Sequence, residues 1–176
     1  RLSFIKGLDI LLQAFSRVQT KAKLVIAGPD DRDGCLPTLR RLIRDFKLGE
    51  KVILSGPLYS HEKLAAFVDA DFSVYPSRYE SFGISAAESI ACGTPVLVTD
   101  KCGIAPLVDG VAGVVTPDNV EGIAAGMNLI LRDTSLLGRL RKGCASVARD
   151  LSWDEPARET ERLYLSLMTK DKTLAV

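Results

Sequence analysis

Two carboxylates, Glu80 and Glu88, flank a small-residue turn in the segment Glu80-Ser-Phe-Gly-Ile-Ser-Ala-Ala-Glu88. The turn predicts a helix that starts near Gly83 and presents unpaired backbone N–H groups and the positive end of its dipole to a phosphate. Carboxylates accept hydrogen bonds from sugar hydroxyls, whereas the N–H groups of Gly83 and Ile84 suit phosphate oxygens. The residue types and their spacing are therefore suited to holding a sugar nucleotide.

The same acids allow a plainer interpretation, in which Glu80 caps the helix and Glu88 lies on a solvated helix face. Glu88 falls about five residues into the predicted helix, roughly 7 to 8 Å along its axis. Its side chain leans toward the helix N-terminus and can reach back over the first turn. Taken alone, the two acids leave both interpretations open.

The chain around this motif alternates between amphipathic helices and short apolar strands. Apolar residues at three- and four-residue spacing predict a helix after Gly7, a second over residues 36–46, a third capped by Ser60, and a mainly helical chain from Asp118 onward. Short apolar runs predict strands at residues 23–28, 51–56, 72–76, 95–99 and 112–115. This alternation predicts an α/β fold with one doubly wound, Rossmann-like parallel sheet covered on both faces.

Ligands of doubly wound sheets bind beyond the carboxyl ends of the strands, where loops enter helices. This rule selects the loop at Gly28, the loop at residues 56–59 and the loop from Ser77 to Gly83. Because the last of these contains Glu80, the paired acids are predicted to lie at the ligand-binding edge of the sheet.

Composition excludes several classes of protein. The 176 residues include 23 Lys and Arg against 22 Asp and Glu, a net charge of +1, so no general attraction to nucleic acid or anionic lipid is expected. No apolar run reaches the length of a membrane span. The four cysteines form no CxxC pair, which favours reduced packing residues and a cytoplasmic protein. The chain begins at Arg1 without Met, so we expect it to be part of a longer protein.

Several motifs suggest other functions but are interpreted more simply. Asp69-Ala-Asp71 has the spacing of a metal motif, yet it lies where a helix gives way to a strand, and we predict no metal site. His61 follows a helix start and is expected to be exposed. The helix face containing Arg40, Arg41, Arg44 and Lys47 has acidic neighbours and is predicted to be solvated rather than to bind nucleic acid. Neither a GxGxxG fingerprint nor a Walker sequence is present, which disfavours NAD and ATP chemistry.

Further segments extend the opening motif in order along the chain: Arg1-Leu-Ser-Phe-Ile-Lys6-Gly-Leu-Asp, Ile26-Ala-Gly-Pro-Asp30, Val52-Ile-Leu-Ser-Gly-Pro57, Ala70-Asp-Phe-Ser-Val-Tyr-Pro-Ser77, Gly93-Thr-Pro-Val-Leu-Val-Thr-Asp100 and Asp109-Gly-Val-Ala-Gly113. With the acids, they resemble the signature of the retaining, GT-B-fold glycosyltransferases of group 1, over nearly the whole chain. The resemblance implies the C-terminal, donor-binding half of such an enzyme. Residues 1–169 would form the nucleotide-sugar domain and 170–176 a polar tail, while the N-terminal acceptor domain would lie outside this chain.

The resemblance also implies a role for each matching residue. Glu80 would contact hydroxyls of the transferred sugar, and Glu88 the ribose of the nucleotide. The backbone around Phe82, Gly83 and Ile84 would contact the pyrophosphate.

A basic pair and a loop residue complete the implied site. Arg1 and Lys6 match the pair that neutralises the leaving nucleoside diphosphate, so no metal or other cofactor is expected. Leu58 would contact the base through its backbone. The chain departs from many relatives at Cys102-Gly-Ile-Ala-Pro106, where they have an acid, which leaves contacts from that turn open.

The implied activity is that of a retaining hexosyltransferase that uses a UDP-, GDP- or ADP-sugar and is inactive without its acceptor domain. The resemblance allows peripheral membrane association of the full enzyme. Trp153 and the last predicted helix match the segment that returns to the partner domain, so without that domain we expect the segment either to pack differently or to expose apolar surface. The alternatives are a sugar-nucleotide epimerase on the same scaffold and a non-catalytic nucleotide-binding or interaction module.

Overall fold

The structure is a computed structural model that describes residues 1–170. A short 3-10 turn, Phe4–Lys6, precedes helix α1 (Leu8–Phe15). The elements that follow are β1 (Leu24–Ala27), α2 (Cys35–Asp45), β2 (Val52–Gly56), α3 (Ser60–Asp69), β3 (Ser73–Tyr75), α4 (Ile84–Ala91), β4 (Val96–Thr99), α5 (Ala105–Val108), β5 (Gly113–Thr116), α6 (Val120–Arg132), α7 (Thr134–Asp150) and α8 (Asp154–Lys170). The predicted α/β alternation is confirmed. Of the predicted polar tail, residues 170–176, Lys170 is the last residue of α8 and residues 171–176 lie outside the described residues.

All strand pairs are parallel, as predicted, but they form two sheets rather than one continuous sheet. Strands β1 and β2 make one sheet, and β3, β4 and β5 make the other, with β4 in the centre. A strand's own alternation of apolar residues does not specify which strand it pairs with, so the sequence predicted the strands but not this division.

A shared hydrophobic core joins the two sheets. Leu97 of β4 belongs to the same buried cluster as Ile26 of β1, together with Leu12 of α1 and Ile123 of α6. A second cluster packs α4 and α7 against β4, and its centre includes Ile90. Helices α1, α2, α4, α6 and α7 each bury apolar residues in one of these clusters, which explains their three- and four-residue spacing, whereas α3 has no buried residue.

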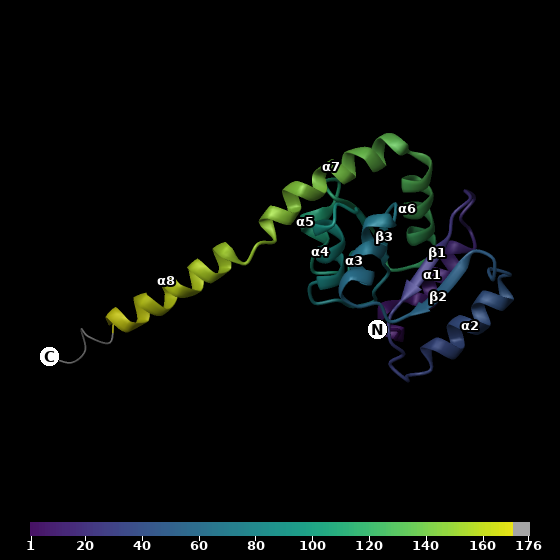
Figure 1. The fold of residues 1–176 in the computed structure, drawn as a ribbon, viewed down its shortest axis with the longest axis horizontal. Coiled ribbons are helices and arrows are strands. Elements are labelled where there is room, and N and C mark those ends of the chain that lie inside the picture. The colour runs from purple at the N-terminus through teal and green to yellow at the C-terminus, as the bar shows by residue number, and fades with distance from the viewer. Residues whose placement is uncertain (171–176) are drawn as a thin grey trace.

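The last helix leaves the body of the molecule. Figure 1 shows α8 projecting beyond α7 as a single helix, away from both sheets. Trp153, just before α8, is 84% exposed, and the exposed apolar residues of the helix are Leu163, Tyr164, Leu165, Leu167 and Met168. Of the two alternatives for this segment, the structure shows the exposure of apolar surface.

One local prediction was wrong. Ser60 is the first residue of α3 rather than its cap, and Tyr59 occupies the cap position without a side-chain hydrogen bond. Ser60 has a φ of 43°, which is a left-handed conformation, whereas an N-cap residue has an extended backbone.

Candidate functional site

The N-terminus of α4 reaches the surface at Ile84, although the preceding Gly83 is itself buried. Gly83 is its cap residue, with a φ of 109° that favours glycine, and no side chain within residues 1–170 caps the helix. Phe82 and Ile84 on either side are exposed. The first backbone N–H groups of α4 therefore remain available to an anion, as the sequence predicted.

Glu80 lies in the loop after β3 and forms an ion pair with Lys6. Its backbone is fixed by the turn at Cys102, because Glu80 N–H donates to the Lys101 carbonyl over 3.1 Å and Gly103 N–H donates to the Glu80 carbonyl over 2.9 Å. The turn at Cys102 thus positions Glu80 through backbone atoms. The helix-cap interpretation of Glu80 was wrong, since its carboxylate binds Lys6 rather than an α4 N–H group.

Lys6 and Glu80 are both accessible to a ligand. Their side chains are 31% and 22% exposed, respectively. Glu80 also lines a surface hollow of about 580 Å³, together with Tyr79, Lys101 and Gly103. The structure therefore brings Lys6 and Glu80, which were predicted to belong to one site, together at the surface.

Glu88 lies in the second turn of α4 and has a cationic partner that the sequence analysis missed. Lys63 of α3 donates a 2.7 Å hydrogen bond to Glu88 Oε1. The side chains of Lys63 and Glu88 are 36% and 34% exposed. Glu88 is therefore a paired, partly buried carboxylate rather than a fully solvated one. A lysine near a helix start carries no local signal of such a long-range partner, so the sequence could not identify it.

The remaining predicted residues are less closely joined to this cluster. The Arg1 guanidinium donates a 3.0 Å hydrogen bond to Asp31 and does not join the Lys6–Glu80 pair. Leu58 is half-buried in the loop that leads into α3, the helix that contains Lys63.

A second ion pair connects the segments that contain Lys6 and Glu80. The Arg78 guanidinium forms two 2.8 Å hydrogen bonds to the Asp9 carboxylate and also donates to the Phe4 carbonyl. The Arg78 N–H donates to the Ile5 carbonyl over 2.9 Å. Burial opposes the ionisation of Asp9, but its hydrogen bonds and attraction to Arg78 outweigh burial and hold the Asp9 pKa below its ordinary value.

The other polar motifs are engaged elsewhere or solvated. Asp71 pairs with Arg141 of α7 at 3.2 Å, and His61 is exposed. In the described part of the chain, no three His, Cys, Asp or Glu side chains gather in a way that could hold a metal ion.

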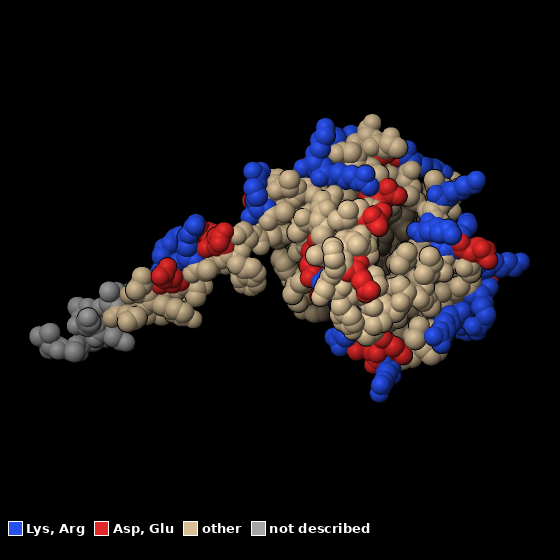
Figure 2. All heavy atoms as spheres, viewed as in Figure 1, with Lys and Arg blue, Asp and Glu red and all other residues tan. Residues whose placement is uncertain are grey.

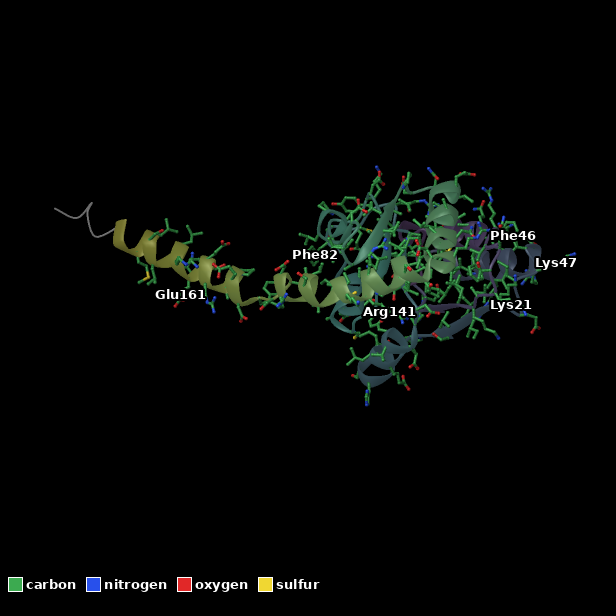
Figure 3. The ribbon with its side chains drawn as sticks, turned by 90° about the horizontal axis from the view of Figure 1, so that it is seen from above. Lys21, Phe46, Lys47, Phe82, Arg141 and Glu161 are labelled. Atoms are coloured by element: carbon green, nitrogen blue, oxygen red, sulfur yellow. The ribbon has the colours of Figure 1, made fainter. Side chains whose placement is uncertain are left out.

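The basic residues of α2 lie far from α4. Figure 3 places Phe46 and Lys47 at the opposite end of the body from Phe82, in agreement with the positions of α2 and α4 in Figure 1. Acidic side chains lie between the basic ones on this face in Figure 2, and Arg41 pairs with Asp45 at 3.3 Å. These features are typical of a solvated, mixed-charge surface.

Comparison with known proteins gives a consistent result. The family model for glycosyl transferases group 1 matches residues 1–149. The uncharacterized glycosyltransferase MJ1607 of Methanocaldococcus jannaschii is 34% identical over 171 residues, which cover 93% of this chain and 43% of that protein. The chain therefore spans less than half the length of this relative.

Solved structures share the fold. Sucrose-phosphate synthase from Thermosynechococcus elongatus superposes with a TM-score of 0.83 at 28% identity, covering 97% of this chain and 44% of that chain. Anabaena Alr3699/HepE, in complex with UDP and glucose, superposes with a TM-score of 0.82 at 23% identity, covering 92% of this chain and 46% of that chain. Among residues 1–170, no helix has the length and apolar character needed to cross a membrane.

The matched family, the parallel α/β fold and the arrangement of acids around α4 agree with one another. The chain belongs to the group 1 glycosyltransferases, and its fold is that of the C-terminal domain of a GT-B enzyme.

Proposed function

We propose that this domain binds the nucleoside-diphosphate sugar of a retaining hexosyltransferase. The observation that carries the proposal is the placement of Glu80 and Glu88 around the uncapped N-terminus of α4, with Lys6 paired to Glu80. The family match and the sugar-nucleotide fragments bound by Anabaena Alr3699/HepE, which shares the fold, support it.

In this proposal each part of the donor meets a group of matching chemistry. The diphosphate accepts hydrogen bonds from the N–H groups of Gly83 and Ile84 and lies at the positive end of the α4 dipole. Glu88 accepts hydrogen bonds from the ribose hydroxyls, and Glu80 accepts them from the hexose. The backbone of Leu58 contacts the base.

The transfer step leaves additional negative charge on the departing nucleoside diphosphate. Lys6 and the N-terminus of α4 are fixed before reaction, so they stabilise this charge without reorganising. Arg1 adds a second cation if its guanidinium leaves Asp31, its partner in this structure. We propose that these groups suffice without a metal ion and that the sugar is transferred with retention of its anomeric configuration.

The proposed acceptor site belongs to an N-terminal domain outside this chain. Closing two domains around the substrates aligns them and excludes water, so the domain alone should bind donor without appreciable transfer. We propose a cytoplasmic location, supported by four free cysteines, with any membrane contact made peripherally by the full enzyme.

Calorimetric titration of the chain with UDP, GDP and ADP tests the proposal. Calorimetry is more direct than fluorescence, because the single tryptophan, Trp153, is exposed beyond α7. We expect one nucleoside diphosphate to bind most tightly. Binding of none of the three would contradict the proposal and favour a structural interaction module.

A further inference from the structure

Lys63 is the ion-pair partner of Glu88, and both side chains are partly exposed. It comes from the first turns of α3, and its Nζ is 2.7 Å from Glu88 Oε1. The two helices are separate in sequence, and the paired residues are 25 positions apart. Neither the sequence motifs nor the proposed donor contacts assign Lys63 a role.

This single-bonded, partly exposed ion pair is expected to contribute only a little to stability. Partly exposed pairs of this kind contribute little to folding, because solvent screens them and the long side chain loses freedom. The pair is nevertheless less exposed than Arg17–Glu121 or Arg158–Glu155 on the outer surface. Lys63 therefore restrains Glu88 at a position that remains within reach of a ligand.

The chemistry of the two groups is complementary to a ribose diol. Lys63 uses one of three N–H donors on Glu88 Oε1, and no hydrogen bond to Glu88 Oε2 is present within residues 1–170. Glu88 Oε2 can accept a hydrogen bond from one ribose hydroxyl, while a second donor of Lys63 can reach a ribose oxygen. Hydrogen bonds to charged groups are stronger than those between neutral groups, which favours both contacts.

We propose that Lys63 is a specificity-determining residue that orients Glu88 toward the ribose hydroxyls and makes the domain select ribonucleotides over deoxyribonucleotides. This inference rests on the proposed function, because it requires a nucleotide with its ribose at Glu88. It differs from a purely structural role, which would affect ribo- and deoxyribonucleotides equally.

The test measures the dissociation constants of UDP, 2′-deoxy-UDP and 3′-deoxy-UDP by calorimetry, or of the matching GDP or ADP set if that base binds more tightly. Lys63→Met should weaken ribonucleotide binding about five- to tenfold, as expected for one charge-assisted hydrogen bond. It should weaken deoxyribonucleotide binding by less than about twofold. The ratio of the deoxyribonucleotide to the ribonucleotide dissociation constant, which measures the preference for ribose, should therefore fall. Lys63→Arg should restore at least part of that preference.

Two further variants keep the outcomes distinct. Lys21→Met removes an exposed lysine at the far end of the body, as Figure 3 shows, and should change no binding constant. If Glu88→Gln leaves ribonucleotide affinity unchanged, the proposed function fails at this site. If Glu88→Gln weakens ribonucleotide binding, three results for Lys63→Met would overturn only the Lys63 inference. These are the same dissociation constants as Lys21→Met, tighter ribonucleotide binding than the wild type, or an equal loss of affinity for ribo- and deoxyribonucleotides.

Discussion

Lys6 and Glu80 are 74 positions apart in the sequence, yet they form an ion pair beside the open N-terminus of α4. The two residues have opposite effects on a bound diphosphate, because Lys6 attracts its charge and Glu80 repels it. We therefore assign Glu80 to the sugar rather than to the phosphates.

This difference gives the first prediction. Lys6→Met should weaken nucleoside diphosphate binding about tenfold, since a cation at a phosphate is worth roughly 1.5 kcal/mol. Glu80→Gln should leave the affinity for the nucleoside diphosphate unchanged or raise it. The same variant should lower the affinity for the corresponding nucleoside-diphosphate hexose. Calorimetry with UDP and UDP-glucose, or the corresponding GDP or ADP pair, measures both. Equal loss of both ligands in Glu80→Gln would contradict the assignment of Glu80 to the sugar.

The Arg78–Asp9 ion pair predicts a pH-dependent stability. Asp9→Asn should lower the free energy of unfolding by about 2 kcal/mol at pH 7, because it weakens a bidentate, charge-assisted contact. The folded-state pKa of Asp9 lies below its ordinary value of 3.8. The contribution of ionised Asp9 to the free energy of unfolding is therefore complete above the ordinary pKa, and it is lost as the pH falls through the folded-state pKa.

Urea unfolding of the wild type and Asp9→Asn across this range measures the effect. The difference between the two proteins should be constant from pH 7 to about pH 5 and should shrink in more acidic solution. A difference that grows on acidification would show that the Asp9 pKa is raised in the folded state, contrary to the structure.

Gly103 predicts a steric effect on the Glu80 loop. A Cβ atom at this position would lie 2.1 Å from the Ser81 carbonyl oxygen, so Gly103→Ala must separate the turn from the loop. We expect a loss of stability of about 2 kcal/mol and weaker sugar-nucleotide binding. Gly138→Ala in α7 is the matched control, because open space surrounds it and alanine favours the helix by about 1 kcal/mol. Equal unfolding midpoints for the two variants would refute the predicted clash.

The cysteines predict a simple labelling pattern. Burial raises the pKa of Cys35 and of Cys144 to about 11, and it also raises the pKa of Cys102. At pH 8 only roughly a thousandth of a thiol with such a pKa is the reactive thiolate. Cys92 is the partly exposed cysteine and should react first with a thiol reagent. Cys92→Ser should remove the fast phase; its persistence would mean that a buried thiol is reactive.

Much of the fold was predictable because its signals are local. The apolar runs that became β1 and β4, and the helix that begins after Gly83, follow from spacing within a few residues. The division into two sheets was not predictable, because strand pairing depends on distant segments.

The site shows the same contrast. The motif and the family resemblance identified Glu80, Glu88 and Lys6, and the structure joins two of these in one ion pair. Lys63 and the Arg78–Asp9 pair were missed, because charged residues on helices and loops give no local sign of a partner 25 or 69 positions away.

The central claim is that Glu88 holds the ribose of a nucleotide whose diphosphate lies at α4. The most direct measurement compares the wild type with Glu88→Gln, using calorimetry with the tightest-binding nucleoside diphosphate and with inorganic diphosphate. The account predicts that Glu88→Gln weakens the nucleoside diphosphate about tenfold or more and leaves inorganic diphosphate unchanged or more tightly bound. Unchanged nucleoside diphosphate affinity in Glu88→Gln would contradict it.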